Sequence, residues 1–218
     1  MRMRRKKHRE DRLEACSHLI IANIEDYKDD IKAVFGNDKP LRIEIGCGKG
    51  KFILETATNN PDTNFIAVEK CSDVLVLAAE KVKAAGLTNV KFVKGDVMQL
   101  SCLESKSKCE VIYINFCDPW MKSGYAKRRL THANFLAMYE KWLQKDGAIH
   151  FKTDNTKLFE FSLNSFADYG LKLKNITLDL HNSKFEGNVM TEYETNFTNL
   201  GQPIYRCEAS FNNQDKCE

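Results

Sequence analysis

Acidic side chains follow three predicted strands in the first half of the chain. Glu44 lies in "EIGCGKG", Glu69 ends "NFIAVE" and Asp96 lies in "KGDV". In a doubly wound sheet, ligands bind outside the carboxyl ends of the strands, so we expect these carboxylates to line one pocket. There, Glu69 could accept hydrogen bonds from both hydroxyls of a ribose, and Asp96 from the amino group of an adenine. Each acid alone could instead cap a helix or lie in a solvated loop. Together they favour a nucleoside that lacks phosphates.

Three glycines follow the first of these strands, with the spacing G-x-G-x-G at Gly46, Gly48 and Gly50. Glycine lets the backbone turn tightly and approach a ligand closely. The spacing differs from the G-x-G-x-x-G of dinucleotide folds. A nicotinamide-dependent oxidoreductase is therefore disfavoured, both by the glycines and by the acidic pocket.

A further acidic turn lies in "NFCDPWMKSGYAKRRLTH", residues 115–132. Asp118 stands directly before Pro119 and Trp120, and four cations follow: Lys122, Lys127, Arg128 and Arg129. Arginine can hold a phosphate by bidentate contacts, and lysine as a point charge. The alternative is that these cations form the solvated start of a helix. Their position after a predicted strand end favours contact with RNA. Trp120 could stack on an unstacked base or pack beneath the turn.

The elements that must position these residues alternate between strands and helices. Apolar runs and glycine or proline boundaries predict strands near residues 41–46, 64–70, 90–96, 111–116 and 147–154, and helices near 48–60, 72–86 and 131–147. Two later strands are predicted at 171–180 and 204–211, with no strong helix between them. The pattern predicts an α/β fold with a doubly wound, Rossmann-like, mostly parallel sheet and an antiparallel C-terminal edge.

The charge of the chain is unevenly distributed. The formal net charge is only +3, whereas the first twelve residues hold seven basic residues (Arg2, Arg4, Arg5, Lys6, Lys7, Arg9 and Arg12) against Glu10 and Asp11. This start is either a basic arm that contacts polyanions or a solvated end. We expect residues 1–36 to form the arm and helical structure packed on a single domain at 37–218, because 218 residues suit one large domain.

No apolar run is long enough to cross a bilayer, and no apolar stretch follows the basic start, which indicates a cytoplasmic protein. The eight cysteines show no C-x-x-C pair and no metal-ligand spacing with histidine. We therefore expect buried, reduced thiols such as Cys47 and Cys207, and no metal site.

Four motifs together resemble the tRNA (guanine-N7-)-methyltransferase family, within the class I S-adenosylmethionine-dependent methyltransferases. The first is E-x-G-x-G-x-G, together with the acids that end the next two predicted strands. The second is D-P-W with the later segment "KRRLT", the third is "FKTDN", and the fourth is "TEYE" followed by Phe197. The resemblance covers almost the whole chain. It implies methyl transfer from S-adenosyl-L-methionine to N7 of a tRNA guanine, position 46 of the variable loop, with S-adenosyl-L-homocysteine as the second product.

The resemblance also implies roles for individual residues. Asp118 would be the catalytic residue and would also contact the cofactor, together with Glu44, Gly46, Gly48, Glu69 and Asp96. The substrate guanine would be bound by Lys122, Asp154, Thr191 and Glu194, and the RNA backbone by Lys127, Arg128 and Arg129. We expect tRNA as the partner, no membrane association, no obligate protein partner, and a monomer or homodimer.

Two alternatives remain open beside this reading. The first is a class I methyltransferase that acts on another RNA, a protein or a small molecule. A protein or small-molecule substrate would leave the basic loop and the N-terminal arm unexplained. A non-catalytic RNA-binding protein on the same scaffold would not need Gly46, Gly48, Glu69 and Asp118. Calorimetry with S-adenosylmethionine and with NAD would separate the cofactor classes.

Overall fold

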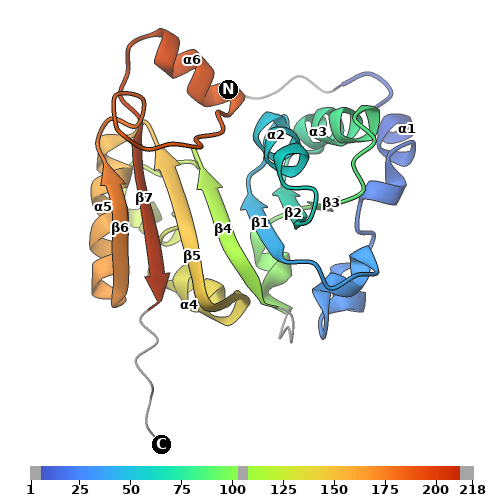
Figure 1. Ribbon diagram of the computed structural model, residues 1–218, viewed down its shortest axis with the longest axis horizontal. Helices are drawn as coiled ribbons and strands as arrows, with labels where there is room; N and C mark the ends of the chain where they lie inside the picture. Colours follow the sequence, from blue (N-terminus) through green and yellow to red (C-terminus); the bar gives the residue numbers. More distant parts are fainter. Residues whose placement is uncertain (1–5, 103–107, 212–218) are drawn as a thin grey trace, which may run out of the picture. The chain divides into compact units, whose positions relative to one another are not determined.

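The computed structural model describes residues 6–102 and 108–211, and the chain divides into two compact units. Among the described residues, the first unit spans 6–102 and 189–192, and the second spans 108–188 and 193–211. The ribbon diagram shows the elements of each unit (Figure 1). Arg2, Arg4 and Arg5 of the predicted basic arm lie outside the described residues.

The first unit contains three parallel strands in the order β3-β2-β1. The strands are β1 (Leu41–Ile45), β2 (Asn64–Glu69) and β3 (Val90–Lys94). The central strand is apolar on both faces, and Phe65, Ile66 and Ala67 are fully buried, as expected for a parallel strand covered on both sides. Helices α2 (Lys51–Asn59) and α3 (Ser72–Ala84) both pack against β2.

The N-terminal segment of this unit is less helical than predicted. Its apolar residues form α1 (Arg9–Glu14) and three short 3₁₀ turns, η1 (Ser17–Leu19), η2 (Ile24–Tyr27) and η3 (Ile31–Phe35). Mixed three- and four-residue spacings suit such short turns as well as one helix. Helix α1 lies on α3, where Arg12 donates two hydrogen bonds to the carboxylate of Glu80, both at 2.6 Å. Arg12 is thus engaged within the protein.

The second unit carries four strands in the order β4-β5-β7-β6. They are β4 (Cys109–Asn115), β5 (Leu143–Thr153), β6 (Leu171–Thr177) and β7 (Tyr205–Phe211). Strands β4 and β5 are parallel, whereas β7 runs antiparallel to both β5 and β6. The predicted fold class, a mostly parallel α/β sheet with an antiparallel C-terminal part, is confirmed. The remaining elements are η4 (Val97–Cys102) in the first unit, and η5 (Ser123–Arg128), α4 (Ala133–Trp142) and α5 (Thr156–Asp168) in the second.

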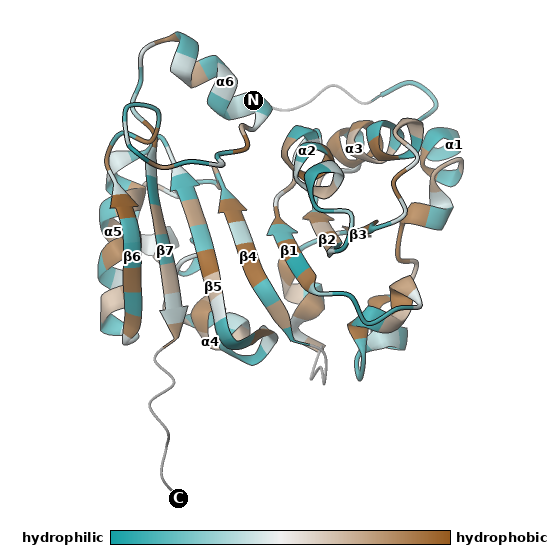
Figure 2. Cartoon of the chain, in the orientation of Figure 1, coloured by the Kyte–Doolittle hydropathy of each residue, from teal (hydrophilic) through white to brown (hydrophobic). Residues whose placement is uncertain are grey.

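Two predictions for this part of the chain, one element boundary and one missing helix, were wrong. Residues 143–147, predicted as the end of a helix, form the start of β5, because the helix ends at Trp142 and Leu143 adopts extended backbone. Helix α6 (Glu192–Asn199) occupies the polar segment for which no strong helix was predicted. Figure 2 shows α6 mostly in hydrophilic and neutral colours, so it lacks the apolar stripe that reveals a helix in sequence.

Cys16, Cys47, Cys109 and Cys207 are buried and free, in agreement with the prediction of reduced thiols. Burial raises the pKa of the Cys109 and Cys207 thiols to about 12 in each case. No helix in the described part of the chain is both long and apolar enough to span a membrane.

Candidate active site

The glycine loop between β1 and α2 requires glycine at several positions. Gly46, Gly48 and Gly50 all have positive φ, between 58° and 81°, which side chains with a Cβ rarely adopt. At Gly50 a Cβ would also lie 2.6 Å from the Cβ of Ala78 on α3. Gly50 thus lets α2 and α3 approach closely, while Gly46 and Gly48 turn the backbone at the end of β1.

Glu69 ties this loop to the end of the neighbouring strand β2. One carboxylate oxygen accepts a hydrogen bond from the backbone N–H of Gly48 at 3.0 Å, and the other from the N–H of Cys71 at 2.7 Å. A carboxylate has about four lone-pair sites. Glu69 therefore fixes the loop and still has capacity to accept from ligand hydroxyls.

The two other predicted acids lie at the ends of β1 and β3. Glu44 is only 1% exposed, and burial raises the pKa of the nearby Cys47 thiol well above its ordinary value, with the charges of Glu44 and Glu69 adding to the effect. Asp96 is half-exposed and accepts from the backbone N–H of Met98 at 3.0 Å. The structure thus brings Glu44, Gly46, Gly48, Glu69 and Asp96 to the carboxyl ends of β1, β2 and β3, where the Lys70 ammonium group lies 3.4 Å from the carboxylate of Asp96.

Glu192 was not predicted from the sequence and belongs to the same unit. One of its carboxylate oxygens accepts from the backbone N–H of Lys51 at 3.3 Å, and the other pairs with the Lys81 ammonium group at 2.6 Å. The contact to Lys51 caps the first turn of α2, directly after the glycine loop. The preceding residue, Thr191, is buried. The "TEYE" motif was the signal that could have pointed to Glu192.

In the second unit, Asp118 lies exposed in a strained turn after β4. The flanking residues Phe116 and Trp120 have φ values of 53° and 42° without being glycine. Such conformations persist only where surrounding contacts enforce them, and they cluster at functional sites. One enforcing contact is the hydrogen bond that the Phe116 N–H donates to the carbonyl of Lys152 on β5, at 2.9 Å.

Arg129 provides further contacts that enforce this turn. Its guanidinium group donates to the carbonyl oxygens of Pro119 and Trp120, both at 3.1 Å, and lies 4.3 Å from the ring centroid of Phe161. These carbonyls belong to the two residues that follow Asp118. Arg129 was predicted to contact RNA, but in this structure its guanidinium group holds the turn that carries Asp118.

The other three cations of the segment are exposed. The Arg128 guanidinium group lies 4.9 Å from the ring centroid of Trp120 and 4.8 Å from that of Tyr125, so it stacks against both aromatic rings. Lys122, directly before η5, and Lys127, in its last turn, are both exposed. Because Arg128 covers Trp120, packing of this indole within the turn is favoured over stacking on a base.

Asp154 follows β5, the strand next to β4. Its neighbour Asn155 caps α5 by accepting from the backbone N–H of Leu158 at 2.8 Å, and it also contacts the sulfur of Met121 at 3.7 Å. Burial raises the pKa of the Tyr193 phenol on α6, and the charges of Asp154 and then Asp118 raise it further. Tyr193 thus lies near both carboxylates.

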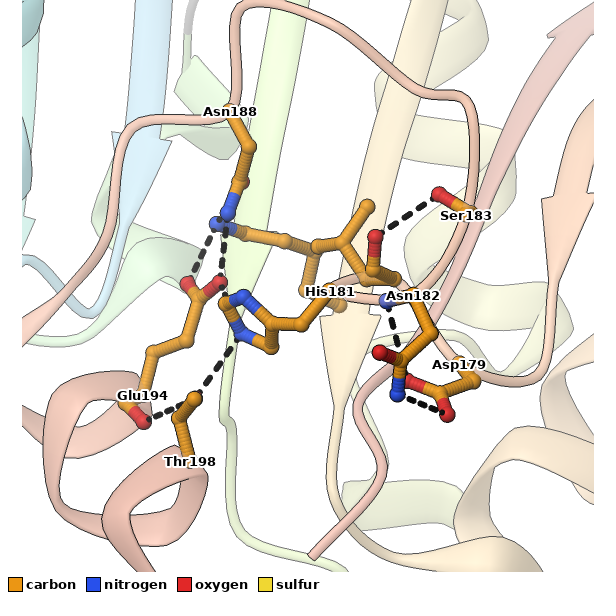
Figure 3. A network of polar contacts seen from close by, with 9 residues as sticks. Asp179, His181, Asn182, Ser183, Asn188, Glu194 and Thr198 are labelled. Atoms are coloured by element: carbon orange, nitrogen blue, oxygen red, sulfur yellow. Dashed lines mark hydrogen bonds and ion pairs between the residues drawn. The ribbon is translucent and has the colours of Figure 1, made fainter. Parts of the chain in front are cut away.

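Glu194, the last residue of "TEYE", is fully buried in the second unit. Figure 3 shows its carboxylate beside the side chains of Asn188 and His181. Lys152 donates to Glu194 at 2.7 Å, Asn188 donates at 2.7 Å, and the His181 ring nitrogen lies at 3.2 Å. Sequence reasoning missed Lys152, Asn188 and His181, because they are distant in the chain and carry no recognisable spacing.

The strand arrangement and the acidic strand ends define a class I methyltransferase. An antibiotic-related methyltransferase of known structure shares this fold, with a TM-score of 0.61 at 19% identity over 84% of this chain and 92% of that chain. A family model described as "Putative methyltransferase" matches residues 38–207. Two curated tRNA (guanine-N(7)-)-methyltransferases are much more similar in sequence. The relative from Bacillus licheniformis is 50% identical and that from Bacillus subtilis is 49% identical, each over 97% of this chain and 99% of the relative.

The chain therefore belongs to the tRNA (guanine-N7-)-methyltransferase family. Membership confirms the family, the enzyme class and the S-adenosylmethionine cofactor that the motifs predicted.

Proposed function

We propose that this chain transfers a methyl group from S-adenosylmethionine to N7 of a guanine in tRNA, at position 46 of the variable loop. The observation that carries the proposal is the clamped turn after β4, which presents Asp118 next to the exposed cations Lys122, Lys127 and Arg128. A carboxylate there suits a positively charged cofactor and product, and the cations suit a polyanion. No metal is required.

The first unit fits the cofactor by its own geometry. Gly46, Gly48 and Gly50 have no side chains to block a close approach to the loop, and Glu69 can accept from ribose hydroxyls while it holds Gly48. Asp96 would accept from the adenine amino group, and Glu44 adds negative charge at the end of β1. When bound, S-adenosylmethionine supplies a methyl group on a positively charged sulfonium.

Guanine N7 carries an in-plane lone pair and no proton, so the reaction needs alignment more than a base. Asp118 would stabilise the positive charge that develops on the purine during transfer. Lys122, Asp154 and Thr191 would hold the guanine, and a carboxylate such as Asp154 can accept from both N1 and the amino group of that base. Lys127 and Arg128 would bind phosphates. We place the reaction in the cytoplasm, in a monomer or homodimer without an obligate protein partner.

Transfer of a labelled methyl group from S-adenosylmethionine to unmodified tRNA, to a protein mixture and to ribosomal RNA tests the substrate class. We expect label in tRNA only. Label in protein or ribosomal RNA with none in tRNA would contradict the proposal. Calorimetry should show binding of S-adenosylmethionine and not of NAD.

Replacing Lys127 and Arg128 together with alanine is expected to raise the apparent KM for tRNA. It should also reduce the slope of log binding constant against log salt by roughly one to two, because each phosphate contact releases counterions. Lys172 on β6 is an exposed lysine outside the site, and its alanine variant serves as the matched control. Filter binding over a range of salt concentrations measures the slope. A slope equal to that of the wild type would remove this pair from the RNA contacts.

Replacing Arg129 with lysine is expected to lower kcat roughly ten- to a hundredfold while leaving the salt slope of tRNA binding nearly unchanged. The variant keeps the charge but loses the two directed hydrogen bonds to Pro119 and Trp120, so Asp118 would shift from its aligned position. Steady-state kinetics and filter binding on one preparation measure both quantities. A flattened salt slope with normal kcat would instead assign Arg129 to the RNA backbone.

A further inference from the structure

The buried carboxylate of Glu194 is held from several sides by the protein. Its Oε2 atom accepts from the Lys152 ammonium group at 2.7 Å, and its Oε1 atom accepts from the Asn188 side-chain amide at 2.7 Å. Lys152 also donates to the side-chain amide oxygen of Asn188 at 3.0 Å, so the side chains of Lys152, Asn188 and Glu194 contact one another pairwise. Glu194 is 0% exposed and the Lys152 side chain 6% exposed. A base edge would have to displace these donors to reach the carboxylate.

The same network joins three segments of the second unit. His181 lies 3.2 Å from Oε1 of Glu194 and shares a 2.9 Å hydrogen bond with the hydroxyl of Thr198, which also donates to the backbone carbonyl of Glu194. Glu194 and Thr198 are on α6, Lys152 is on β5, and His181 and Asn188 lie between β6 and α6. The network therefore fixes α6 and the preceding segment to the end of β5, two residues before Asp154.

Tyr193, which precedes Glu194, is 47% exposed. Its ring stacks on Phe197 one turn later, with centroids 4.4 Å apart at 23°. It also contacts Phe116, with centroids 5.3 Å apart at 40°. Phe116 stands two residues before Asp118 in the strained turn. Tyr193 is thus an exposed aromatic ring that is supported by two others, beside the predicted catalytic carboxylate.

We propose that Tyr193 is the residue of α6 that contacts the target guanine, and that the buried pair of Lys152 and Glu194 positions it rather than reading the base. RNA bases are commonly recognised unstacked, against aromatic rings. A ring face also stabilises positive charge, and N7 methylation makes the purine cationic, so this contact strengthens as the reaction proceeds. The inference rests on the proposed function, because it requires a guanine beside Asp118.

Single-turnover methylation of unmodified tRNA by Tyr193→Phe and Tyr193→Leu variants tests the stacking contact. The phenylalanine variant should remain within about threefold of the wild type. The leucine variant should lose roughly five- to a hundredfold in kcat/KM, the range that loss of one base–aromatic stack spans. Asn196→Ala, at an exposed residue of the same helix, is the control.

A leucine variant with wild-type kinetics, in an enzyme that methylates tRNA, would overturn only the inference about Tyr193. A wild-type chain that leaves tRNA unmethylated would overturn the proposed function as well.

The positioning role of Glu194 has two separate readouts. If Glu194 reads the guanine amino group, Glu194→Gln should weaken the preference for guanine over inosine, which lacks that group, at the target position of the tRNA. If Glu194 positions Tyr193, that preference should persist while kcat falls. The double variant Lys152→Met with Glu194→Leu should then recover part of the activity that Glu194→Leu loses, because no unpaired charge stays buried. Loss of the guanine preference, or no recovery in the double variant, would contradict the positioning role.

Discussion

Asp118→Asn is expected to lower kcat for tRNA methylation about a hundredfold or more, while the affinities for S-adenosylmethionine and tRNA change much less. The loss follows from removing a negative charge that stabilises the developing cation in the transition state, an effect of the same size as removing one oxyanion-hole donor. Because Asp118 is exposed, the variant should fold normally. Single-turnover kinetics at saturating cofactor and tRNA measure the chemical step.

Asp146→Asn is a matched control for this variant, since Asp146 is an exposed aspartate at the start of β5 and outside the site. It should retain the wild-type rate. Proton release during the single turnover adds a second comparison. A general base and a charge-stabilising carboxylate both act in the ionised form, so a rate that rises with pH fits either role. Only charge stabilisation without proton transfer predicts no proton release coupled to the step. A wild-type single-turnover rate in a folded Asp118→Asn variant would remove Asp118 from the catalytic residues.

Glu69→Ala is expected to weaken S-adenosylmethionine binding roughly five- to 150-fold, equivalent to about 1–3 kcal/mol for ligand hydroxyls left without their acceptor. The same change removes the acceptor for the Gly48 N–H, so the glycine loop also loses its tie to β2. Isothermal titration calorimetry gives the affinity directly. Glu55→Ala on the exposed face of α2 removes a carboxylate from the same unit and serves as the control. An unchanged Kd for Glu69→Ala would mean that the end of β2 does not bind the ribose.

The strands could be predicted because their sequence signal is local. Residues 65–68 are continuously apolar, with Pro61 shortly before them and Glu69 directly after, and a fully buried parallel strand has this pattern. The acids at the ends of β1, β2 and β3 follow from strand prediction plus one topological rule. These parts of the candidate site therefore needed no knowledge of tertiary contacts.

The remaining features depend on contacts between residues far apart in the chain. Helix α6 has few apolar residues, and it is held by the network of Glu194 with Lys152, 42 residues away. The side chain of Arg129 could equally have faced solvent, and only the fold shows that it points back to Pro119 and Trp120. Composition and spacing identify a cation or a carboxylate, whereas tertiary packing decides whether it meets a ligand or the protein.

Methylation at guanine N7 is tested most directly by mass spectrometry of nucleosides from tRNA transcripts incubated with the full chain and S-adenosylmethionine. Two transcripts are compared, one with guanine at position 46 of the variable loop and one with 7-deazaguanine there, which has carbon in place of N7. We expect 7-methylguanosine from the first transcript and no methylated nucleoside from the second. Methylation of the 7-deazaguanine transcript, or a methyl group on any other atom of the guanine, would contradict it.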